Sequence, residues 1–515
     1  MQRSPWPDCG RSLTVAIALV LIGCAAPVEE APPPATAATA YLVPPPADYG
    51  GLAIDLGPCT PRGMDEEVRC GTYEVLEDRA RPDGRRIGIR VVVLPATGET
   101  PAPDPLVLLP GGPGQGITAV AFFFNRILSP VREKRDLVLI DPRGTGASSP
   151  LHCPLPGSDE DPQSYLGDQF PVEALAACAA KLEADLTRYA TPDVIQDLDE
   201  IRAALGYERI NLYGISYGSR VALAYLRHFP SRARSAILNG VVPTSMRVPQ
   251  HHAPDAQRAL DLLFDECAAD AGCAAAFPDL RDKFWAVHRR LAEEGPVTVA
   301  LTDPKTAKPI EVELNLDLFN EEIRWRLYDE ESNLVPILVQ EAYDGDYAGI
   351  AELLLRLRRA VAAGGILAVG AFMSATCTED TPFIDLAQAG RLAAGTFLGL
   401  YRVEQQRAAC EAWPRGTLTA GFHEPVRSEA PVLLLSGYRD PVTPPRWGEE
   451  VTRYLPNGRH VVLRQSFHTE GTPCGAEMVR RFLEDRSAVD LDERCAAEGK
   501  PTPFVLARDP QQPFE

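Results

Sequence analysis

Three short motifs contain the residue types that nucleophilic catalysis needs. The motif G-I-S-Y-G places a glycine two residues before and two residues after Ser216, the motif S-G-Y-R-D ends at Asp440, and Q-S-F-H ends at His468. A serine hydroxyl becomes a good nucleophile when a neutral imidazole accepts its proton, and a buried carboxylate then holds that imidazole in the correct tautomer. The motifs therefore predict a catalytic triad of Ser216, His468 and Asp440.

Each triad residue follows an apolar segment that is typical of a buried strand. These segments are R-I-N-L-Y before Ser216, P-V-L-L-L before Asp440 and H-V-V-L before His468, and a helical pattern follows Ser216. Glycines on both sides of the serine allow a tight turn that exposes its hydroxyl at the top of a sheet. We therefore expect all three side chains at the carboxyl edge of one sheet. The remaining histidines are predicted to serve packing or to lie at the surface: His152, His228, His251, His252, His288, His423 and His460.

An oxyanion hole should accompany this triad, because negative charge develops on the substrate oxygen. One backbone N–H is expected from Tyr217, the residue after the nucleophile, and the second from the loop after an earlier strand. The segment P-L-V-L-L-P-G-G-P-G-Q-G, residues 105–116, supplies such a strand and loop. Pro113 has no N–H group, so Gly112 is the predicted donor. The loop lacks the Lys-Ser/Thr of a phosphate-binding P-loop.

Alternating apolar strands and amphipathic helices predict an α/β fold with a mostly parallel sheet. Between Pro243 and Glu429 the pattern changes to long amphipathic helices with one small hairpin, which is typical of a cap inserted over the site. We expect a signal peptide at residues 1–23, a Pro/Ala-rich tether at 24–50, the first part of the core at 51–242, a helical cap at 243–429 and the second part of the core at 430–515.

Several of these motifs resemble one family of enzymes. The G-G-P-G loop, D-L-V-L-I-D-P-R-G-T-G-A-S and G-I-S-Y-G-S are similar to the prolyl-iminopeptidase and tripeptidyl-aminopeptidase group of α/β-hydrolases, and D-P-V-T-P with the cysteine-bearing tail resembles its secreted tripeptidyl-aminopeptidase-like branch. The resemblance runs from about Cys59 to the end of the chain. It implies the α/β-hydrolase fold and a serine peptidase that acts on free amino termini. Pro110 departs from the histidine that many relatives have in H-G-G-P-G.

Two other functions remain open from the sequence. The same triad could serve a carboxylesterase acting on small acyl esters, and a surface lipoprotein could bind peptides without cleaving them. The formal net charge of −20 and the lack of a basic stripe argue against nucleic acid as a partner. The chain has no C-x-x-C and no H-E-x-x-H motif, so we expect neither a metal nor another cofactor.

An acidic pair in the cap segment is a candidate for binding the substrate amine. The motif S-A-T-C-T-E-D-T-P-F contains Glu379 and Asp380. An aminopeptidase must recognise a protonated amino terminus, and a buried cation requires a carboxylate partner. The alternative is an ordinary solvated loop or the N-cap of a helix, which T-E-D-T-P fits equally well.

The amino terminus reads as an export signal that ends in a lipid-modified cysteine. Arginines flank a short basic region, and the apolar run L-T-V-A-I-A-L-V-L-I that follows is too short to span a bilayer. The segment L-I-G-C at residues 21–24 resembles a lipobox, in which Cys24 becomes the lipidated first residue of the mature protein. We therefore expect a lipid-anchored protein at the bacterial cell envelope. An ordinary cleaved signal with a chance cysteine is the alternative.

Cysteine usage also indicates export. Of twelve cysteines, Cys9 and Cys24 fall in the signal region, which leaves ten, and an even number is typical of disulfides in an oxidising compartment. Spacing alone does not fix the connectivity. The family resemblance favours pairing between sequence neighbours, namely Cys59–Cys70, Cys153–Cys178, Cys267–Cys273, Cys377–Cys410 and Cys474–Cys495.

Overall fold

A computed structural model describes residues 53–365, 367–469, 471–485, 487, 491–498 and 502–508. The signal segment, Cys24 and the Pro/Ala-rich tether expected from the sequence lie outside these residues. Within the described ranges, no helix is both long enough and apolar enough to cross a membrane.

A nine-stranded sheet forms the centre of the protein, with strand order β1-β2-β3-β5-β4-β6-β7-β10-β11. In the stretch of the sheet from β5 through β4, β6, β7 and β10 to β11, every pair of neighbouring strands is parallel. Strands β1, β2 and β3 continue the sheet beyond β5, and their pairs are antiparallel. The predicted mostly parallel sheet is confirmed. The strands are β1 Gly57–Cys59, β2 Val68–Leu76, β3 Arg86–Leu94, β4 Leu106–Leu109, β5 Leu137–Ile140, β6 Ile210–Ile215, β7 Ala233–Asn239, β10 Val432–Gly437 and β11 Gly458–Leu463.

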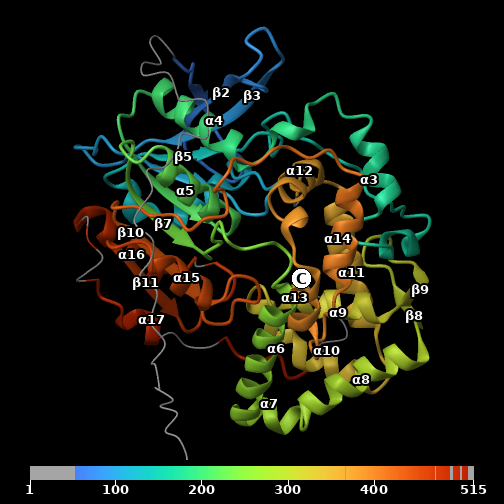
Figure 1. The fold of residues 1–515 in the computed structure, drawn as a ribbon. Coiled ribbons are helices and arrows are strands. Elements are labelled where there is room, and N and C mark those ends of the chain that lie inside the picture. The colour runs from blue at the N-terminus through green and yellow to red at the C-terminus, as the bar shows by residue number, and fades with distance from the viewer. Residues whose placement is uncertain are drawn as a thin grey trace, which may run out of the picture. The chain divides into compact units, whose positions relative to one another are not determined.

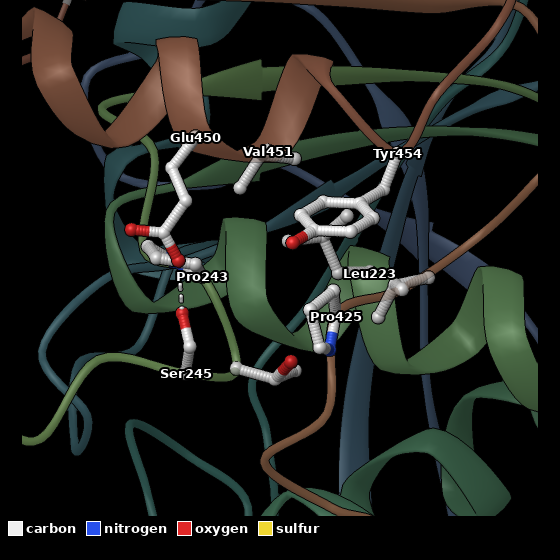
Figure 2. Close-up of a pocket in the computed structure, with 9 residues that line it drawn as sticks. Leu223, Pro243, Ser245, Pro425, Glu450, Val451 and Tyr454 are labelled. Carbon is white, nitrogen blue, oxygen red and sulfur yellow. Dashed lines mark hydrogen bonds between the residues drawn. The ribbon is translucent and has the colours of Figure 1, made fainter. Parts of the chain in front are cut away.

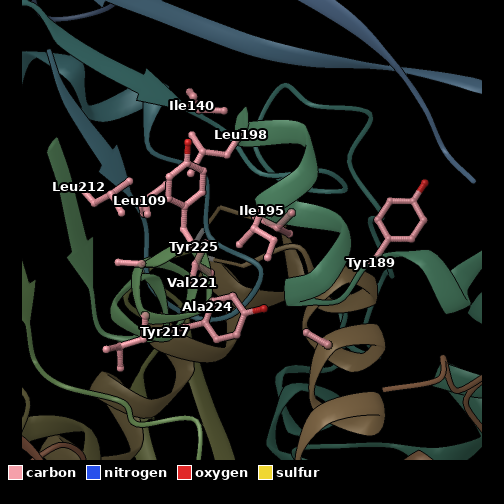
Figure 3. Packing of buried hydrophobic residues seen from close by; sticks show 14 of the residues in the cluster. Leu109, Ile140, Tyr189, Ile195, Leu198, Leu212, Tyr217, Val221, Ala224 and Tyr225 are labelled. Carbon is pink, nitrogen blue, oxygen red and sulfur yellow. The ribbon is translucent and has the colours of Figure 1, made fainter. Parts of the chain in front are cut away.

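The central strands are apolar throughout because helices cover both faces of the sheet. Alternate residues of β4 point to opposite faces: Val107 and Leu109 pack with α4 and α5, and Leu106 and Leu108 pack with α1 and α16. Figure 3 shows the first of these layers, in which Tyr225 and Ile195 lie between the two helices and the sheet. The core helices are α1 Ala121–Ile127, α2 Ser129–Arg132, α3 Val172–Ala179, α4 Thr191–Ala204, α5 Tyr217–His228, α15 Pro445–Thr452, α16 Pro473–Asp485 and α17 Arg494–Glu498.

A long insertion between β7 and β10 carries most of the remaining helices, which Figure 1 shows gathered on one side of the sheet. It has its own apolar core around Phe284 and Phe319, both fully buried. Its elements are α6 His252–Ala269, α7 Ala271–Ala276, α8 Leu280–Glu294, β8 Val297–Thr302, β9 Pro309–Leu314, α9 Leu316–Arg326, α10 Val335–Tyr343, α11 Ala348–Ala362, α12 Val369–Glu379, α13 Leu386–Ala393 and α14 Tyr401–Glu411. Single-turn 3₁₀ segments complete the fold: η1 Thr118–Val120, η2 Pro162–Leu166, η3 Leu186–Arg188, η4 Glu330–Leu334 and η5 Thr381–Phe383.

Helix α12 of the insertion packs into the core of the sheet, together with the end of α14. Phe372, Met373 and Cys377 of α12 are buried in the same apolar cluster as the residues of α4 and α5. The Phe372 ring stacks on Phe170 with 5.7 Å between ring centroids. Helix α12 therefore forms the joint between the sheet and the rest of the insertion.

Five disulfide bonds join cysteines that are neighbours in the sequence. The pairs are those that the family resemblance implies, and the two partners lie between 6 and 33 residues apart along the chain. Each pair closes before the next begins, so no two loops cross. The bonds are Cys59–Cys70, Cys153–Cys178, Cys267–Cys273, Cys377–Cys410 and Cys474–Cys495.

Candidate active site

Ser216 occupies a strained turn between β6 and α5. Its φ of 53° and ψ of −120° lie in a region that residues with a side chain rarely adopt. A Cβ on Gly214 would lie 2.4 Å from the Gly218 carbonyl oxygen, and a Cβ on Gly218 would lie 2.2 Å from the Leu109 oxygen. Both positions must therefore be glycine if the helix is to approach the sheet this closely.

Hydrogen bonds on both sides hold the strained serine. The Ser216 amide donates to the Asn239 carbonyl oxygen at 2.8 Å, and the Ser219 hydroxyl donates to the Ser216 carbonyl oxygen at 2.6 Å. The turn is thus fixed by β7 and by the first turn of α5. A strained nucleophile persists only when its surroundings determine it in this way.

The structure brings together the three residues that the sequence predicts as a triad. His468 Nε2 lies 3.0 Å from Ser216 Oγ, and His468 Nδ1 lies 2.9 Å from Asp440 Oδ2. Asp440 follows β10 and His468 follows β11, so all three lie at the carboxyl ends of parallel strands. This geometry lets Ser216 donate its proton to Nε2 while Nδ1–H donates to the carboxylate.

The Asp440 carboxylate is fully buried and satisfied by its neighbours. The amides of Val442 and Thr443 each donate to Oδ1 at 2.7 Å, and the Thr443 hydroxyl donates to Oδ2 at 2.6 Å. Burial raises the pKa of Asp440, but the charge of His468 and these hydrogen bonds outweigh it and hold the pKa below its usual range. Asp440 is therefore an anion wherever the histidine works as a base.

Thr443 also contacts the catalytic histidine. Its Oγ1 lies 3.2 Å from His468 Nδ1 as well as 2.6 Å from Asp440 Oδ2. A threonine three residues after the acid can bond to the acid or cap the next turn. Because Pro444 is the N-cap of α15, Thr443 does not cap that helix, and its hydroxyl instead bonds to Asp440.

The proposed oxyanion donors lie on either side of the nucleophile. Tyr217 is the first residue of α5, so its N–H has no acceptor within the helix. The glycine loop after β4 passes so close that a Cβ on Gly111 would lie 3.2 Å from Ser216 Cβ. Gly112 has a φ of +107°, which glycine adopts without strain. The donor roles of Gly112 and Tyr217 stay predictions.

Asp141 holds the glycine loop in place, a role that the sequence did not reveal. Its carboxylate is buried and accepts hydrogen bonds from the amides of Ile117 and Thr118 at 2.6 and 2.8 Å, and from the amide of Ala147 at 2.9 Å. It thereby ties the end of the glycine loop to the D-P-R-G-T-G turn. The only feature of the sequence that could have indicated this role is the position of Asp141 directly after the buried strand β5.

The insertion reaches the catalytic histidine through Tyr328, which follows α9. The amide of His468 donates to the Tyr328 carbonyl oxygen at 3.0 Å, and the two rings meet edge to face with 5.2 Å between centroids. Nothing in the sequence marks this residue, because the contact depends on packing between distant segments. The insertion is therefore in direct contact with the catalytic loop.

Glu379 and Asp380, the candidates for amine binding, are buried beneath the nucleophile helix. Arg220 of α5 donates to both carboxylates, at 3.2 Å to Glu379 and at 3.0 Å to Asp380. Glu379 also accepts from the amide of Thr191 at 2.6 Å and from the hydroxyl of Tyr217 at 3.2 Å. Burial raises the pKa of Asp380 to about 6, although Arg220 acts in the opposite direction. A substrate amine would have to displace Arg220, and amine binding stays a prediction.

The hollow shown in Figure 2 is separate from the triad. It lies between α5 and α15, and Ser245 donates to Glu450 at 2.5 Å across one side of it. Within the described ranges, no group of three or more histidine, cysteine or acidic residues is arranged to hold a metal ion.

The sheet order, the strained serine and the Ser-His-Asp contacts together define an α/β-hydrolase. Residues 104–291 match the family described as alpha/beta hydrolase fold, and residues 396–495 match the family described as TAP-like protein. The α/β-hydrolase fold expected from the sequence is confirmed, and the carboxy-terminal part of the chain is similar to TAP-like proteins. The resemblance to the prolyl-iminopeptidase and tripeptidyl-aminopeptidase group is confirmed.

Curated relatives match about half of the chain or less. The protein named Serine protease Hip1 of Mycobacterium tuberculosis (strain ATCC 25618 / H37Rv) is 32% identical over 281 residues, which are 50% of this chain and 51% of the relative. The Tripeptidyl aminopeptidase of Streptomyces lividans is 31% identical over 199 residues, 35% of this chain and 37% of that protein. The match to the first relative thus spans about half of its length.

Among solved structures, the proline iminopeptidase of Mycobacterium smegmatis is 15% identical and aligns with 81% of this chain and 98% of its own. The TM-score is 0.38, which is too low to support any conclusion.

We predict that Thr443→Val lowers kcat by about 10- to 100-fold, because a hydrogen bond to a charged group is worth about 1.5–3 kcal/mol. Thr443→Ser keeps the hydroxyl and should retain most of the activity. Turnover of a chromogenic ester gives kcat, and thermal unfolding of both variants shows whether they fold. A well-folded Thr443→Val variant with native turnover would contradict the role assigned to this hydroxyl.

Proposed function

We propose that this protein is a serine hydrolase that cleaves peptides through an acyl-enzyme on Ser216. The observation that carries the proposal is the pair of contacts from His468, at 3.0 Å to Ser216 Oγ and 2.9 Å to Asp440 Oδ2. The strained turn and the buried, anionic Asp440 add support, because both are the arrangements that nucleophilic catalysis by serine requires.

The reaction follows from these contacts. Ser216 Oγ attacks the substrate carbonyl carbon while its proton passes to His468 Nε2. The amides of Gly112 and Tyr217 stabilise the oxyanion that forms. His468 then gives its proton to the leaving group, which departs and leaves the acyl-enzyme, and water activated by the same imidazole releases the acid. Asp440 remains ionised and stabilises the imidazolium in both steps.

The TAP-like match and the peptidase names of the relatives support a peptide as the substrate. We propose an aminopeptidase that releases short pieces, of the tripeptidyl type, from free amino termini. The five disulfide bonds support an exported protein, since such bonds persist in oxidising compartments. We further propose a lipid anchor at Cys24 on the bacterial cell envelope.

The test of this function is digestion of a peptide library with free and acetylated amino termini, read by mass spectrometry. We expect cleavage of the free peptides and loss of at least about 1000-fold in kcat for Ser216→Ala, because the triad acts as a unit. A fluorophosphonate probe should label the native protein at Ser216. Probe labelling without peptide cleavage would favour a carboxylesterase, and no labelling of the folded protein would favour a peptide-binding protein.

Glu379→Gln separates two roles for the acidic pair. Because Glu379 already accepts hydrogen bonds from Thr191, Tyr217 and Arg220, we expect the variant to lose turnover on a small acyl ester, which has no amino terminus, as well as on free peptides. Kinetics of the native and variant proteins on both substrates provide the measurement. A loss confined to the free-amine substrate would instead establish that Glu379 binds the substrate amine.

Cys24→Ser should abolish lipid modification and leave the globular part folded, because the Pro/Ala-rich segment separates Cys24 from the first strand. Detergent phase separation of the native and variant proteins after expression in a bacterium is the test. If the processed native protein stays entirely in the aqueous phase, the lipid anchor is wrong.

A further inference from the structure

Two arginines of the insertion line one cavity and form no ion pair among the described residues, and one of them contacts the tyrosine that packs against His468. Arg324, at the end of α9, is 4% exposed, and its guanidinium donates to the Tyr328 hydroxyl at 2.8 Å. The Tyr328 ring in turn contacts the His468 ring. In the described part of the chain Arg324 forms no ion pair, and its other close neighbours are the rings of Trp325 and Tyr328, at 5.0 and 5.4 Å.

Arg402, near the start of α14, shares a small cavity with Arg324. Its guanidinium lies 4.5 Å from the centre of the Phe170 ring, and its closest polar contact among the described residues is Gln406 Oε1 at 3.4 Å. Burial, and then the charge of Arg324, lower the pKa of Arg402 to about 9. The guanidinium remains protonated at neutral pH, and the Glu321 carboxylate, which acts in the opposite direction, compensates its charge only in part.

The acidic groups of the same cavity do not satisfy these arginines. Glu321 accepts from Arg358 at 2.6 Å and is occupied by it. Asp317 lies two helical turns before Arg324 on α9, and burial raises its pKa. Arg324 is the cavity residue that contacts Tyr328, and through Tyr328 it is linked to His468.

A buried histidine of the same insertion has ring nitrogens without hydrogen-bond partners among the described residues. His252, the first residue of α6, is 6% exposed, and neither ring nitrogen has a hydrogen-bond partner among the described residues. Burial, and then the charges of Arg402 and Arg324, lower its pKa well below the usual range, and the charge of His468 acts in the same direction. The sequence predicted packing or a surface position for this residue. A buried imidazole with both nitrogens unsatisfied instead marks a place where a ligand atom can enter.

We propose that Arg324, Arg402 and His252 form a subsite that binds a carboxylate of the substrate beside the catalytic histidine. Three helices that are far apart in sequence, α6, α9 and α14, supply one donor each, and Figure 1 shows all three in the helical insertion. Unpaired buried cations are costly, and an entering carboxylate removes that cost while gaining charge-assisted hydrogen bonds. The inference rests on the proposed peptidase function and specifies its substrates as peptides with an anionic group near the scissile bond.

The carboxylate has two sources in a peptide, the chain terminus of a short substrate and an acidic side chain. Both sources supply the same group to the subsite, a carboxylate. The native enzyme distinguishes them with two matched pairs, tetra-alanine as the free acid and as the C-terminal amide, and Ala-Ala-Ala-Glu-amide against Ala-Ala-Ala-Gln-amide. We expect kcat/KM to be at least about tenfold higher for the acidic member of one pair or both, mainly through KM. The pair that responds identifies the source.

Variants of Arg324 and Arg402 test whether the preference for the acidic substrate depends on this subsite. Arg402→Gln and Arg324→Gln should each reduce the acid preference to about twofold or less, whereas Arg407→Gln should retain it. Arg407 is the matched control, because it is on the same helix α14 and loses the same charge but is paired with Glu411 near the surface. Thermal unfolding of the three proteins identifies any variant that fails to fold, and the two arginines give independent tests.

A binding measurement separates this inference from the proposed function. Calorimetric titration of the full-length Ser216→Ala protein with the same peptides should give a Kd at least about tenfold lower for the acidic member of the responding pair. Acid-dependent binding without any peptide cleavage by the native enzyme would overturn the peptidase function and keep the subsite. Equal kcat/KM and equal Kd for the members of both pairs would overturn the subsite, as would an acid preference that survives in both arginine variants.

Discussion

The active site depends on how closely three backbone segments approach one another around Ser216. Gly214 and Gly218 lack side chains, so the end of β6, the start of α5 and the end of β4 come within distances that a single Cβ would prevent. The same close approach brings the glycine loop against the nucleophile. Gly437 allows a similar close approach at the end of β10, where a Cβ would lie 1.8 Å from the Phe467 carbonyl oxygen. Steric room created by absent side chains thus positions both the serine and the histidine loop.

Among the contacts that join the helical insertion to the rest of the protein, two reach the serine and histidine elements. Arg220 extends from the nucleophile helix to two buried carboxylates of the α12 end, and Tyr328 accepts a hydrogen bond from the backbone of His468. Removing one partner from a buried charge group leaves the others uncompensated, which is strongly unfavourable. The insertion therefore supports the serine and histidine elements themselves.

Local sequence predicted much of the fold and the triad, because apolar strands, glycine turns and the order Ser, Asp, His are all short-range signals. β1 and β2 were missed, although β2 alternates buried and exposed residues as a strand with one covered face does. The partners of Glu379 and the contact of Tyr328 with His468 could not be predicted, since they join segments more than 130 residues apart. Arg324 and Arg402 carry no motif, and only the folded structure shows that they share a cavity in which the Glu321 carboxylate is bonded to Arg358.

The order of the disulfides along the chain affects how this protein can mature. Ten cysteines allow on the order of a thousand complete pairings, but here every cysteine bonds to the next one in sequence. A chain that crosses a membrane from its amino end presents these thiols in that same order. An oxidising enzyme that joins each new thiol to the one just before it would therefore produce the native set directly. For the exported protein proposed above, rearrangement by an isomerase is then not required, because the order of the bonds along the chain is compatible with vectorial assembly.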